Sequence, residues 1–373
     1  MKRAPTDFAH RVLMTTDTVG GVWNYALELC RNLSASSVEI LLATMGAPPR
    51  AEQRDAARGI PGVALRESDF ALEWMQDPWT DVARASEWLW ELEQEFQPDV
   101  VHLNGYVHGT VPWTAPTLMV GHSCVLSWWE GVKGEPAPAN WARYREAVSH
   151  GLNAAHVVVA PTDWMAGELV RLYQLPRRPR VIHNGRDPSR YDSITAKEDF
   201  VLGVGRLWDE AKNLQALAEI AGDLPWRVRL VGDMRSPDGA SRAFAGVESL
   251  GYARESAVAE LMARAALYVM PAKYEPFGLS ILEAALSGCA LVLGDIPPLR
   301  EVWGDAAIFV PPGSATALRA RCIELIHDDA KRRALGEKAR RRALHFTARK
   351  MSAAYLSCYR QLTEKSKRAS SAR

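Results

Sequence analysis

Short apolar runs alternate with helical patterns along most of this chain, and this alternation restricts the fold more than any other feature. In the first half, runs typical of buried strands lie at 11–16, 38–44, 100–103, 117–121, 157–160 and 181–183. In the second half they lie at 200–204, 228–231, 268–270, 290–293 and 307–310. Helical patterns separate most of them, which is typical of parallel strands whose sheet is covered by helices on both faces. The sequence therefore predicts an α/β fold with two doubly wound, Rossmann-like domains.

A polar stretch at 187–197, which contains Pro188 and Ser189, is the predicted break between the domains. The length of 373 residues suits two domains, which we place at 1–186 and 187–346. Residues 46–61 are rich in Pro, Gly, Ala and Arg and are predicted to form a loop. A last amphipathic helix is expected in 347–373, followed by a disordered tail from Lys365 that is rich in Ser, Lys and Arg.

Charge and cysteine content exclude several classes of protein. The net charge of +1 gives no support for a nucleic-acid-binding protein. The five cysteines are odd in number and form no Cys-x-x-Cys pair, which suits a reducing cytoplasm and argues against a disulfide framework or a structural zinc site. No apolar run approaches the length of a membrane span, and the N-terminus lacks the apolar core of a signal peptide. We therefore expect a cytoplasmic protein. The basic stretch at 331–342 is interpreted as a solvated helix face, with a patch that binds phosphate or makes peripheral contact with a membrane surface as the alternative.

Two glutamates stand out in the stretch 274–288, which follows the apolar run at 266–271. A turn is expected at Pro276 and Gly278, and a largely apolar helix should follow over 279–286. Glu283 lies in the middle of that helix, where a buried carboxylate is costly without a partner. Glu275 precedes the helix, whose N-terminus is a ready site for an anion. Together these groups suit the hydroxyls and the diphosphate of a nucleotide-sugar. The alternative is a surface glutamate and a core helix with one salt-bridged glutamate.

This stretch resembles the Glu-x7-Glu motif of retaining glycosyltransferases of the GT-B fold, especially glycosyltransferase family 4, with Glu275 and Glu283 at the acidic positions. Three further segments are similar to the family's motifs and follow its order. The segment 203–213 resembles the Gly-Arg-Leu…Lys-Asn loop, 181–185 resembles a segment near the interdomain crossover, and 17–22 resembles the N-terminal glycine-rich loop. The family's Asp after 183–185 is Asp187 here, displaced by Arg186.

The resemblance implies two domains that face each other across a cleft, with the last helix crossing back to the N-terminal domain. It also implies roles for particular residues. Arg206 and Lys212 would clamp the diphosphate, Glu283 would hold the ribose diol, and Glu275 would hold sugar hydroxyls. A histidine at the end of a strand, His122, would lie beside the donor sugar. The catalytic set is thus His122, Arg206, Lys212 and Glu275, and the donor-binding set is Gly20, Gly21, Arg206, Lys212, Glu275, Phe277, Gly278, Leu279, Ser280 and Glu283. Taken singly, the cations could be surface residues and the histidine structural.

The segment 124–141 is the predicted acceptor lid. Its glycines and prolines at 131, 134, 136 and 138 predict that no regular element runs through its middle. Trp128 and Trp129 are adjacent, so at least one should be exposed, and we expect them to contact the acceptor. In the alternative, both rings pack beneath the loop as a small cluster.

The expected activity is therefore retaining transfer of a sugar from a nucleotide-diphosphate sugar, with UDP-sugars favoured by their frequency in the family. The acceptor would be the hydroxyl of a glycan, a lipid or a small molecule. No Asp-x-Asp pair occurs, so no metal and no other cofactor is implied. Three alternatives stay open: a non-catalytic nucleotide-sugar-binding protein, a GT-B sugar-nucleotide epimerase, and a dinucleotide oxidoreductase. The oxidoreductase is disfavoured because Trp208 occupies the third glycine position of the dinucleotide fingerprint.

Overall fold

The computed structural model describes residues 9–236, 239 and 243–371, which form two compact units. The first unit contains Met1–Ser127, Pro136–His183 and Ala348–Arg373, and the second contains Trp128–Glu135 and Asn184–Thr347. Residues 128–135 thus group with the second unit, although they precede the predicted break at 186/187.

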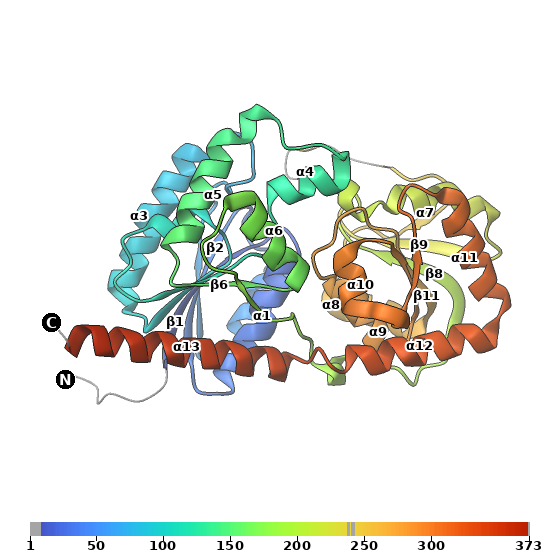
Figure 1. Cartoon of the computed structure of the whole chain (residues 1–373). Helices are drawn as coiled ribbons and strands as arrows, with labels where there is room; N and C mark the ends of the chain where they lie inside the picture. The colour runs from blue at the N-terminus through green and yellow to red at the C-terminus, as the bar shows by residue number, and fades with distance from the viewer. Residues whose placement is uncertain (1–8, 237–238, 240–242, 372–373) are drawn as a thin grey trace. The chain divides into compact units, whose positions relative to one another are not determined.

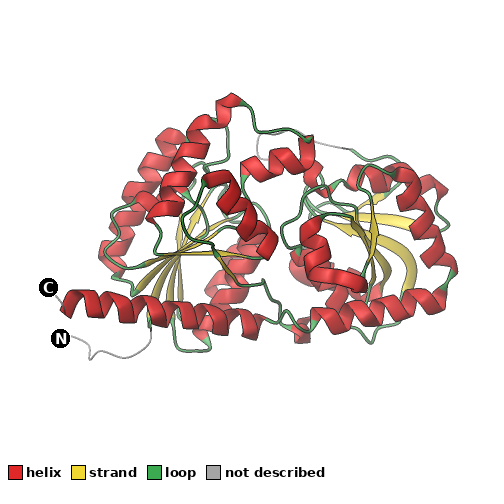
Figure 2. Cartoon of the chain, viewed as in Figure 1, coloured by secondary structure: helices red, strands yellow, loops and turns green. Residues whose placement is uncertain are grey.

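The first unit is built on a seven-stranded parallel sheet in the order β3-β2-β1-β4-β5-β6-β7 (Figures 1 and 2). Its strands are β1 (Arg11–Asp17), β2 (Glu39–Met45), β3 (Val63–Glu67), β4 (Val100–Leu103), β5 (Thr117–Val120), β6 (Val157–Ala160) and β7 (Arg180–Val181). Its helices are α1 (Gly21–Ser34), α2 (Ala51–Arg58), α3 (Trp79–Phe96), α5 (Ala142–Ala154), α6 (Asp163–Tyr173) and α13 (Ala348–Ser371), and α13 packs against α1. The strand order reverses direction between β1 and β4, so the chain leaves those two strands toward opposite edges of the sheet.

The second unit is a six-stranded parallel sheet in the order β10-β9-β8-β11-β12-β13, with helices on its faces (Figure 2). Its strands are β8 (Glu198–Val204), β9 (Arg227–Val231), β10 (Glu248–Ser249), β11 (Ala265–Met270), β12 (Ala290–Gly294) and β13 (Ile308–Val310). Its helices are α7 (Leu214–Ile220), α8 (Glu255–Arg264), α9 (Leu279–Leu286), α10 (Pro297–Trp303), α11 (Ala315–His327) and α12 (Asp329–Ala343). This strand order is that of a Rossmann sheet, with the reversal between β8 and β11. The predicted fold of two doubly wound, parallel-sheet domains is confirmed.

Two local predictions are wrong. The stretch 46–61 contains α2, whose N-terminus is closed by a hydrogen bond from the Arg50 N–H to the Gln53 side chain. The tail from Lys365, predicted to be disordered, continues α13 as far as Ser371. Its Lys, Arg and Ala residues are good helix formers, and lengthening an existing helix requires no new nucleation. Among the described residues, no helix combines the length and apolar character that a membrane span requires.

The basic stretch at 331–342 lies on α12, where its cations have partners within the protein. Lys331 pairs with Glu324, and Lys338 pairs with Asp305 at 2.5 Å. The guanidinium of Arg342 donates to the carbonyl of Val302 at 2.6 Å. These contacts fit the interpretation of α12 as a solvated face whose long side chains also close neighbouring helix ends.

Candidate functional site

The loops that follow β8 and β11 meet at the point where the second sheet reverses its strand order. Leu202 of β8 pairs with Tyr268 of β11, so the carboxyl ends of the two strands are adjacent. Beyond the strands, the Lys273 N–H donates to the carbonyl of Ala211 at 2.8 Å, and the Asn213 side chain donates to the carbonyl of Pro271 at 2.8 Å. Open α/β sheets bind their ligands at such a point. The loop with Arg206 and Lys212 is therefore joined to the loop with Glu275 where a ligand site is expected.

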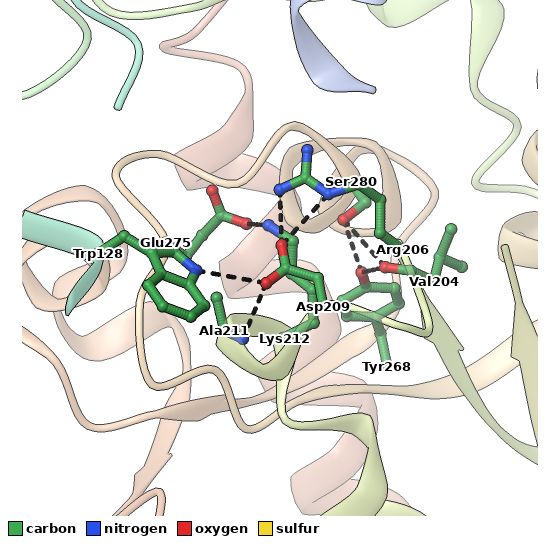
Figure 3. A network of polar contacts seen from close by, with 9 residues as sticks. All are labelled: Trp128, Val204, Arg206, Asp209, Ala211, Lys212, Tyr268, Glu275 and Ser280. Carbon is green, nitrogen blue, oxygen red and sulfur yellow. Dashed lines mark hydrogen bonds and ion pairs between the residues drawn. The ribbon is translucent and has the colours of Figure 1, made fainter. Parts of the chain in front are cut away.

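Arg206 is held by a carboxylate that the sequence analysis did not single out, Asp209 (Figure 3). The guanidinium donates to Asp209 Oδ2 from Nε at 3.2 Å and from a terminal nitrogen at 2.6 Å. The other oxygen of Asp209 accepts the Ala211 N–H at 3.0 Å and the indole N–H of Trp128 at 3.4 Å. Burial by itself would raise the pKa of Asp209, but Arg206 and Lys212 outweigh it and hold that pKa below its ordinary value. The Asp209 side chain is only 4% exposed whereas that of Arg206 is 38% exposed, so the cation reaches solvent from a buried anchor.

Lys212 pairs with Glu275, so two residues of the predicted catalytic set are in direct contact (Figure 3). Their Nζ and Oε2 atoms lie 2.5 Å apart, and both side chains are largely buried. Lys212 ends a short 3-10 helix, Glu210–Lys212, whose first turn is closed by Asp209. The site thus holds two cations on one loop, each paired with a carboxylate.

Helix α9 begins directly after the loop that contains Glu275. Gly278 precedes it with φ +88°, a left-handed conformation, and a Cβ there would lie 2.6 Å from Cδ1 of Ile281. Only glycine is tolerated at such a position. The predicted donor-binding residues Phe277, Gly278, Leu279 and Ser280 lie at this helix start, where the first N–H groups have no intrahelical partner and suit an anion. The Ser280 hydroxyl accepts a hydrogen bond from the Tyr268 hydroxyl at 2.9 Å, which fixes the first turn to β11.

Glu283, a buried carboxylate for which a partner was expected, has one within the protein. Its Oε1 atom accepts a hydrogen bond from Nε of Arg186 at 2.8 Å and a second one from a terminal nitrogen of the same guanidinium. Arg186 is completely buried. Burial raises the pKa of Glu283, and the charge of Arg186 opposes this rise. These contacts are those of the alternative, a core glutamate in a salt bridge. In the sequence, Arg186 stands out only as the residue that displaces Asp187.

The predicted acceptor lid is helical in its first half, where an irregular segment was expected, and irregular at 134–138, as expected. Helix α4 (Val125–Lys133) contains Gly131 and is followed by Gly134, whose φ is +74°. One internal glycine costs a helix only about 1 kcal/mol, and here it makes room, because a Cβ on Gly131 would lie 3.1 Å from the Tyr274 ring. Trp128 and Trp129 are both partly buried and meet edge to face at 5.9 Å between ring centroids. Neither is fully exposed, and their contact with an acceptor stays a prediction.

Gly20, Gly21 and His122 belong to the first unit, whereas the other predicted donor-binding residues belong to the second. Gly20 precedes α1 and Gly21 begins it. The Nε2 atom of His122 lies 2.8 Å from Oδ1 of Asn104, and the amide nitrogen of Asn104 donates to the carbonyl of Thr15 at 2.8 Å. That second bond fixes the amide, so Nε2 of His122 carries the proton and Nδ1 is the acceptor. Burial lowers the pKa of His122 to about 3, which keeps the ring neutral.

Comparisons with known proteins agree with this architecture. Residues 19–190 match the family described as Glycosyltransferase Family 4, and residues 192–342 match the one described as Glycosyl transferases group 1. O-antigen chain mannosyltransferase B of Escherichia coli is 25% identical over 60% of this chain and 66% of its own length, which is just under two thirds. N-acetyl-alpha-D-glucosaminyl L-malate synthase of Bacillus anthracis is 23% identical over 87% of this chain and 89% of its own length.

Two solved structures show the same fold. Sucrose-phosphate synthase of Thermosynechococcus elongatus superposes with a TM-score of 0.77 at 18% identity, covering 95% of this chain and 100% of that one. Anabaena Alr3699/HepE in complex with UDP-glucose gives a TM-score of 0.72 at 17% identity, covering 95% and 98% of the two chains. The two family matches together cover most of the chain, and both describe glycosyltransferases. This chain therefore combines the two family domains of a GT-B glycosyltransferase, and its fold is GT-B.

Proposed function

We propose that this protein is a retaining family 4 glycosyltransferase that transfers a sugar from a nucleoside-diphosphate sugar, a UDP-sugar above all, to an acceptor hydroxyl without a metal ion. One observation carries the proposal: Arg206, Lys212 and the N-terminus of α9 lie on joined loops where the second sheet reverses its strand order. These groups can neutralise the negative charge that develops on a departing diphosphate, and such preorganised donors supply a large part of catalysis. Solved relatives in complex with UDP and UDP-glucose support the choice of donor.

The contacts of Lys212, Arg206 and His122 suggest how the donor binds. The diphosphate would take over Lys212 from Glu275, which leaves the carboxylate of Glu275 free to accept hydrogen bonds from sugar hydroxyls. Arg206 would stay on Asp209 through the edge that carries Nε and one terminal nitrogen, and it would offer its other edge to the diphosphate. His122 is neutral and presents Nδ1, so it would accept a hydrogen bond from a hydroxyl of the donor sugar.

The acceptor proton has a destination on the substrate itself. In the front-face displacement that the family resemblance implies, the bond between the anomeric carbon and the phosphate oxygen breaks as the acceptor oxygen bonds to the same face. The departing phosphate oxygen takes the acceptor proton. The work of the protein in this scheme is to hold the diphosphate and the sugar, and Arg206 and Lys212 supply the positive charge that a metal ion would otherwise provide.

A ligand screen followed by a turnover assay tests the proposal. UDP at about 100 times its Kd should stabilise the fold by about 2.7 kcal/mol, which corresponds to a rise in Tm of about 5–10 °C for a domain of this size. NAD should have no effect. UDP-sugar should then be hydrolysed slowly without an acceptor, and NMR should show that the released sugar or product keeps the donor's anomeric configuration.

Other outcomes select the alternatives. Stabilisation without any release of UDP would indicate a non-catalytic binding protein, and a changed sugar on the nucleotide would indicate an epimerase. Preferential stabilisation by GDP or ADP would change the donor class. If no nucleoside diphosphate or nucleotide-sugar raises the Tm, the proposed function is wrong.

A further inference from the structure

Four residues of alternating charge in the second unit are linked by ion pairs that begin at the predicted donor-binding residue Glu283. In order they are Glu283, Arg186, Glu255 and Arg190. Glu283 of α9 is bonded to Arg186, and a terminal nitrogen of Arg186 lies 3.8 Å from Glu255 at the start of α8. Arg190 is the last of them, 3.0 Å from the second oxygen of Glu255. Arg186 is completely buried, whereas Arg190 is one-third exposed. A fully buried guanidinium is rare, and this one is bonded to a carboxylate that is predicted to bind a ligand. This arrangement indicates that Arg186 acts on the function of Glu283.

We propose that Arg186 is a positioning residue for the nucleotide: it turns Glu283 into an acceptor with one available oxygen, Oε2. The proposal rests on the proposed function, because Glu283 matters for a ligand only if the site holds a nucleotide. It adds a residue that the motifs do not include, and it specifies which atom of Glu283 meets the ligand.

The hydrogen bonds of Glu283 support this division between its two oxygens. Oε1 receives two N–H groups from Arg186, which fill its acceptor capacity. Oε2 receives no hydrogen bond from any described residue, and it is not among their buried unsatisfied atoms. The Glu283 side chain is 10% exposed, so Oε2 is the part that reaches solvent. A ribose hydroxyl can therefore donate to Oε2 without displacing Arg186.

The backbone of Arg186 is itself held by the neighbouring segment at 346–347. Its N–H donates to the carbonyl of Phe346 at 3.1 Å, and the residue forms a parallel bridge with Thr347. The guanidinium is planar, so bonding through Nε and a terminal nitrogen sets the plane and the position of the carboxylate. Lysine could supply the charge but not this fixed direction. The orientation of Glu283 thus depends on the shape of Arg186 as well as on its charge.

The charges around Glu283 explain why its ionisation depends on this one residue. The groups that face it are Arg186, Arg190 and Glu255, together with the hydroxyls of Tyr191 and Tyr268. Burial raises the pKa of Glu283, Glu255 adds to the rise, and Arg186 is the stronger of the two opposing cations. Without Arg186, burial and Glu255 would raise the pKa of Glu283 further, with only Arg190 left to oppose them. A protonated Glu283 presents a different hydrogen-bonding pattern to the ribose than the carboxylate does.

Calorimetric titration of UDP into the full chain between pH 6 and 8.5 tests the proposal. The affinity of Arg186→Met relative to wild type should be at least tenfold lower at pH 6 than at pH 8.5, because UDP binding must first remove the proton from Glu283. Expressing each affinity relative to wild type at the same pH cancels the titration of the UDP phosphate. Buffers with different ionisation enthalpies should report release of a proton on binding, in excess of wild type. Arg190→Met is the matched control and should stay within twofold of wild type throughout.

Two further variants separate positioning from folding. Arg186→Lys should restore a flat pH profile but not the full affinity. Lysine supplies the positive charge beside Glu283, but it lacks the planar guanidinium that orients the carboxylate. The double variant Arg186→Met with Glu283→Gln removes both charges, and its affinity relative to wild type should be low but independent of pH. This double variant also serves if the single methionine variant does not fold, because a pH-dependent ratio in it would contradict titration of Glu283.

The outcomes distinguish this inference from the function on which it rests. If wild type binds UDP and the relative affinity of Arg186→Met does not change with pH, the inference is wrong and the proposed function stands. A lower Tm without any change in the pH profile would make Arg186 a structural residue only. If wild type binds no nucleoside diphosphate, the proposed function and the inference are both overturned.

Discussion

Replacing Arg206 with methionine is expected to slow sugar transfer about 100-fold or more, the usual cost of removing one preorganised donor from a developing negative charge. The structure makes this a demanding test, because Arg206 also has a structural partner. Its two hydrogen bonds to Asp209, at 3.2 and 2.6 Å, are lost in the same variant. The stability cost of the broken pair has to be separated from the loss of catalysis.

The stability cost can be worked out from the contacts that remain. Asp209 keeps the Ala211 N–H at 3.0 Å and the Trp128 indole N–H at 3.4 Å. A hydrogen bond to a charged group contributes about 1.5–3 kcal/mol, and solvent screening of the 38% exposed arginine moves the value to the lower end. We expect a loss of about 1–2 kcal/mol, or a Tm lower by roughly 2–8 °C. Transfer assays at 25 °C would then still measure a folded enzyme.

Asp209→Asn supplies the matched control. It breaks the same ion pair and should lower the Tm by a similar amount, but it leaves the cation of Arg206 in the site. Turnover, followed as release of UDP at saturating donor and acceptor, should fall less than tenfold. If Asp209→Asn lost as much turnover as Arg206→Met, the broken pair and not the missing cation would be the cause. Near-normal turnover of Arg206→Met would refute the clamp assignment itself.

Three further predictions concern other residues. Glu275→Gln should lower sugar transfer while binding of free UDP stays near wild type by calorimetry, because Glu275 is assigned to the sugar; an equal loss of UDP affinity would contradict that assignment. Trp129→Ala should raise the acceptor KM and leave acceptor-free donor hydrolysis unchanged, whereas equal loss of both with a lower Tm would make this tryptophan structural. Burial lowers the pKa of His102 and His122 to about 3 and that of His108 to about 4. These values lie below about 6.5, the value in unfolded chains. In that window the unfolded chain binds more protons, so stability should fall with decreasing pH by about 1.4 kcal/mol per pH unit for each histidine. Tm measured from pH 7 to 4 should decline less steeply in His108→Gln than in wild type, and equal slopes would show that His108 does not contribute.

The sequence predicted both sheets because buried parallel strands are continuous apolar runs, and such runs are legible without knowledge of neighbours. Strands β3 and β10 were missed because neither is a buried apolar run. The strand β3, Val63–Glu67, lies at an edge and is partly exposed along its length, and β10 has only two residues. Edge strands need less apolar surface, so their sequences resemble those of loops.

The candidate site was predictable where its residues belong to local motifs and not where distant segments meet. Arg206, Lys212 and Glu275 were identified from their spacing, and Asp209 could have been, because it stands three residues after Arg206 and matches an ion-pair spacing. Arg186 was out of reach, because 97 residues separate it from Glu283. Only the packing of α9 against the segment after β7 reveals that pair, and sequence pattern carries no information about it.

The four charged residues of the predicted donor-binding set are already paired within the protein, in three pairs: Arg206 with Asp209, Lys212 with Glu275, and Glu283 with Arg186. Under the proposed function, the diphosphate takes Lys212 from Glu275, while Arg206 stays bonded to Asp209 and Glu283 to Arg186. Part of the attraction between Lys212 and the diphosphate therefore offsets the loss of the Lys212–Glu275 pair, and Asp209 already neutralises part of the charge of Arg206. The balance changes when the bond to the sugar breaks, because negative charge then grows on the diphosphate while Asp209 and Glu275 gain none. Interactions that strengthen only at that stage raise turnover without tightening donor binding. Because the two cations are already paired, they are expected to stabilise the transition state more than the bound donor. This predicts that neutral substitutions of Arg206 and Lys212 lower kcat more than they weaken binding of the donor, and a larger effect on donor affinity than on kcat would contradict it.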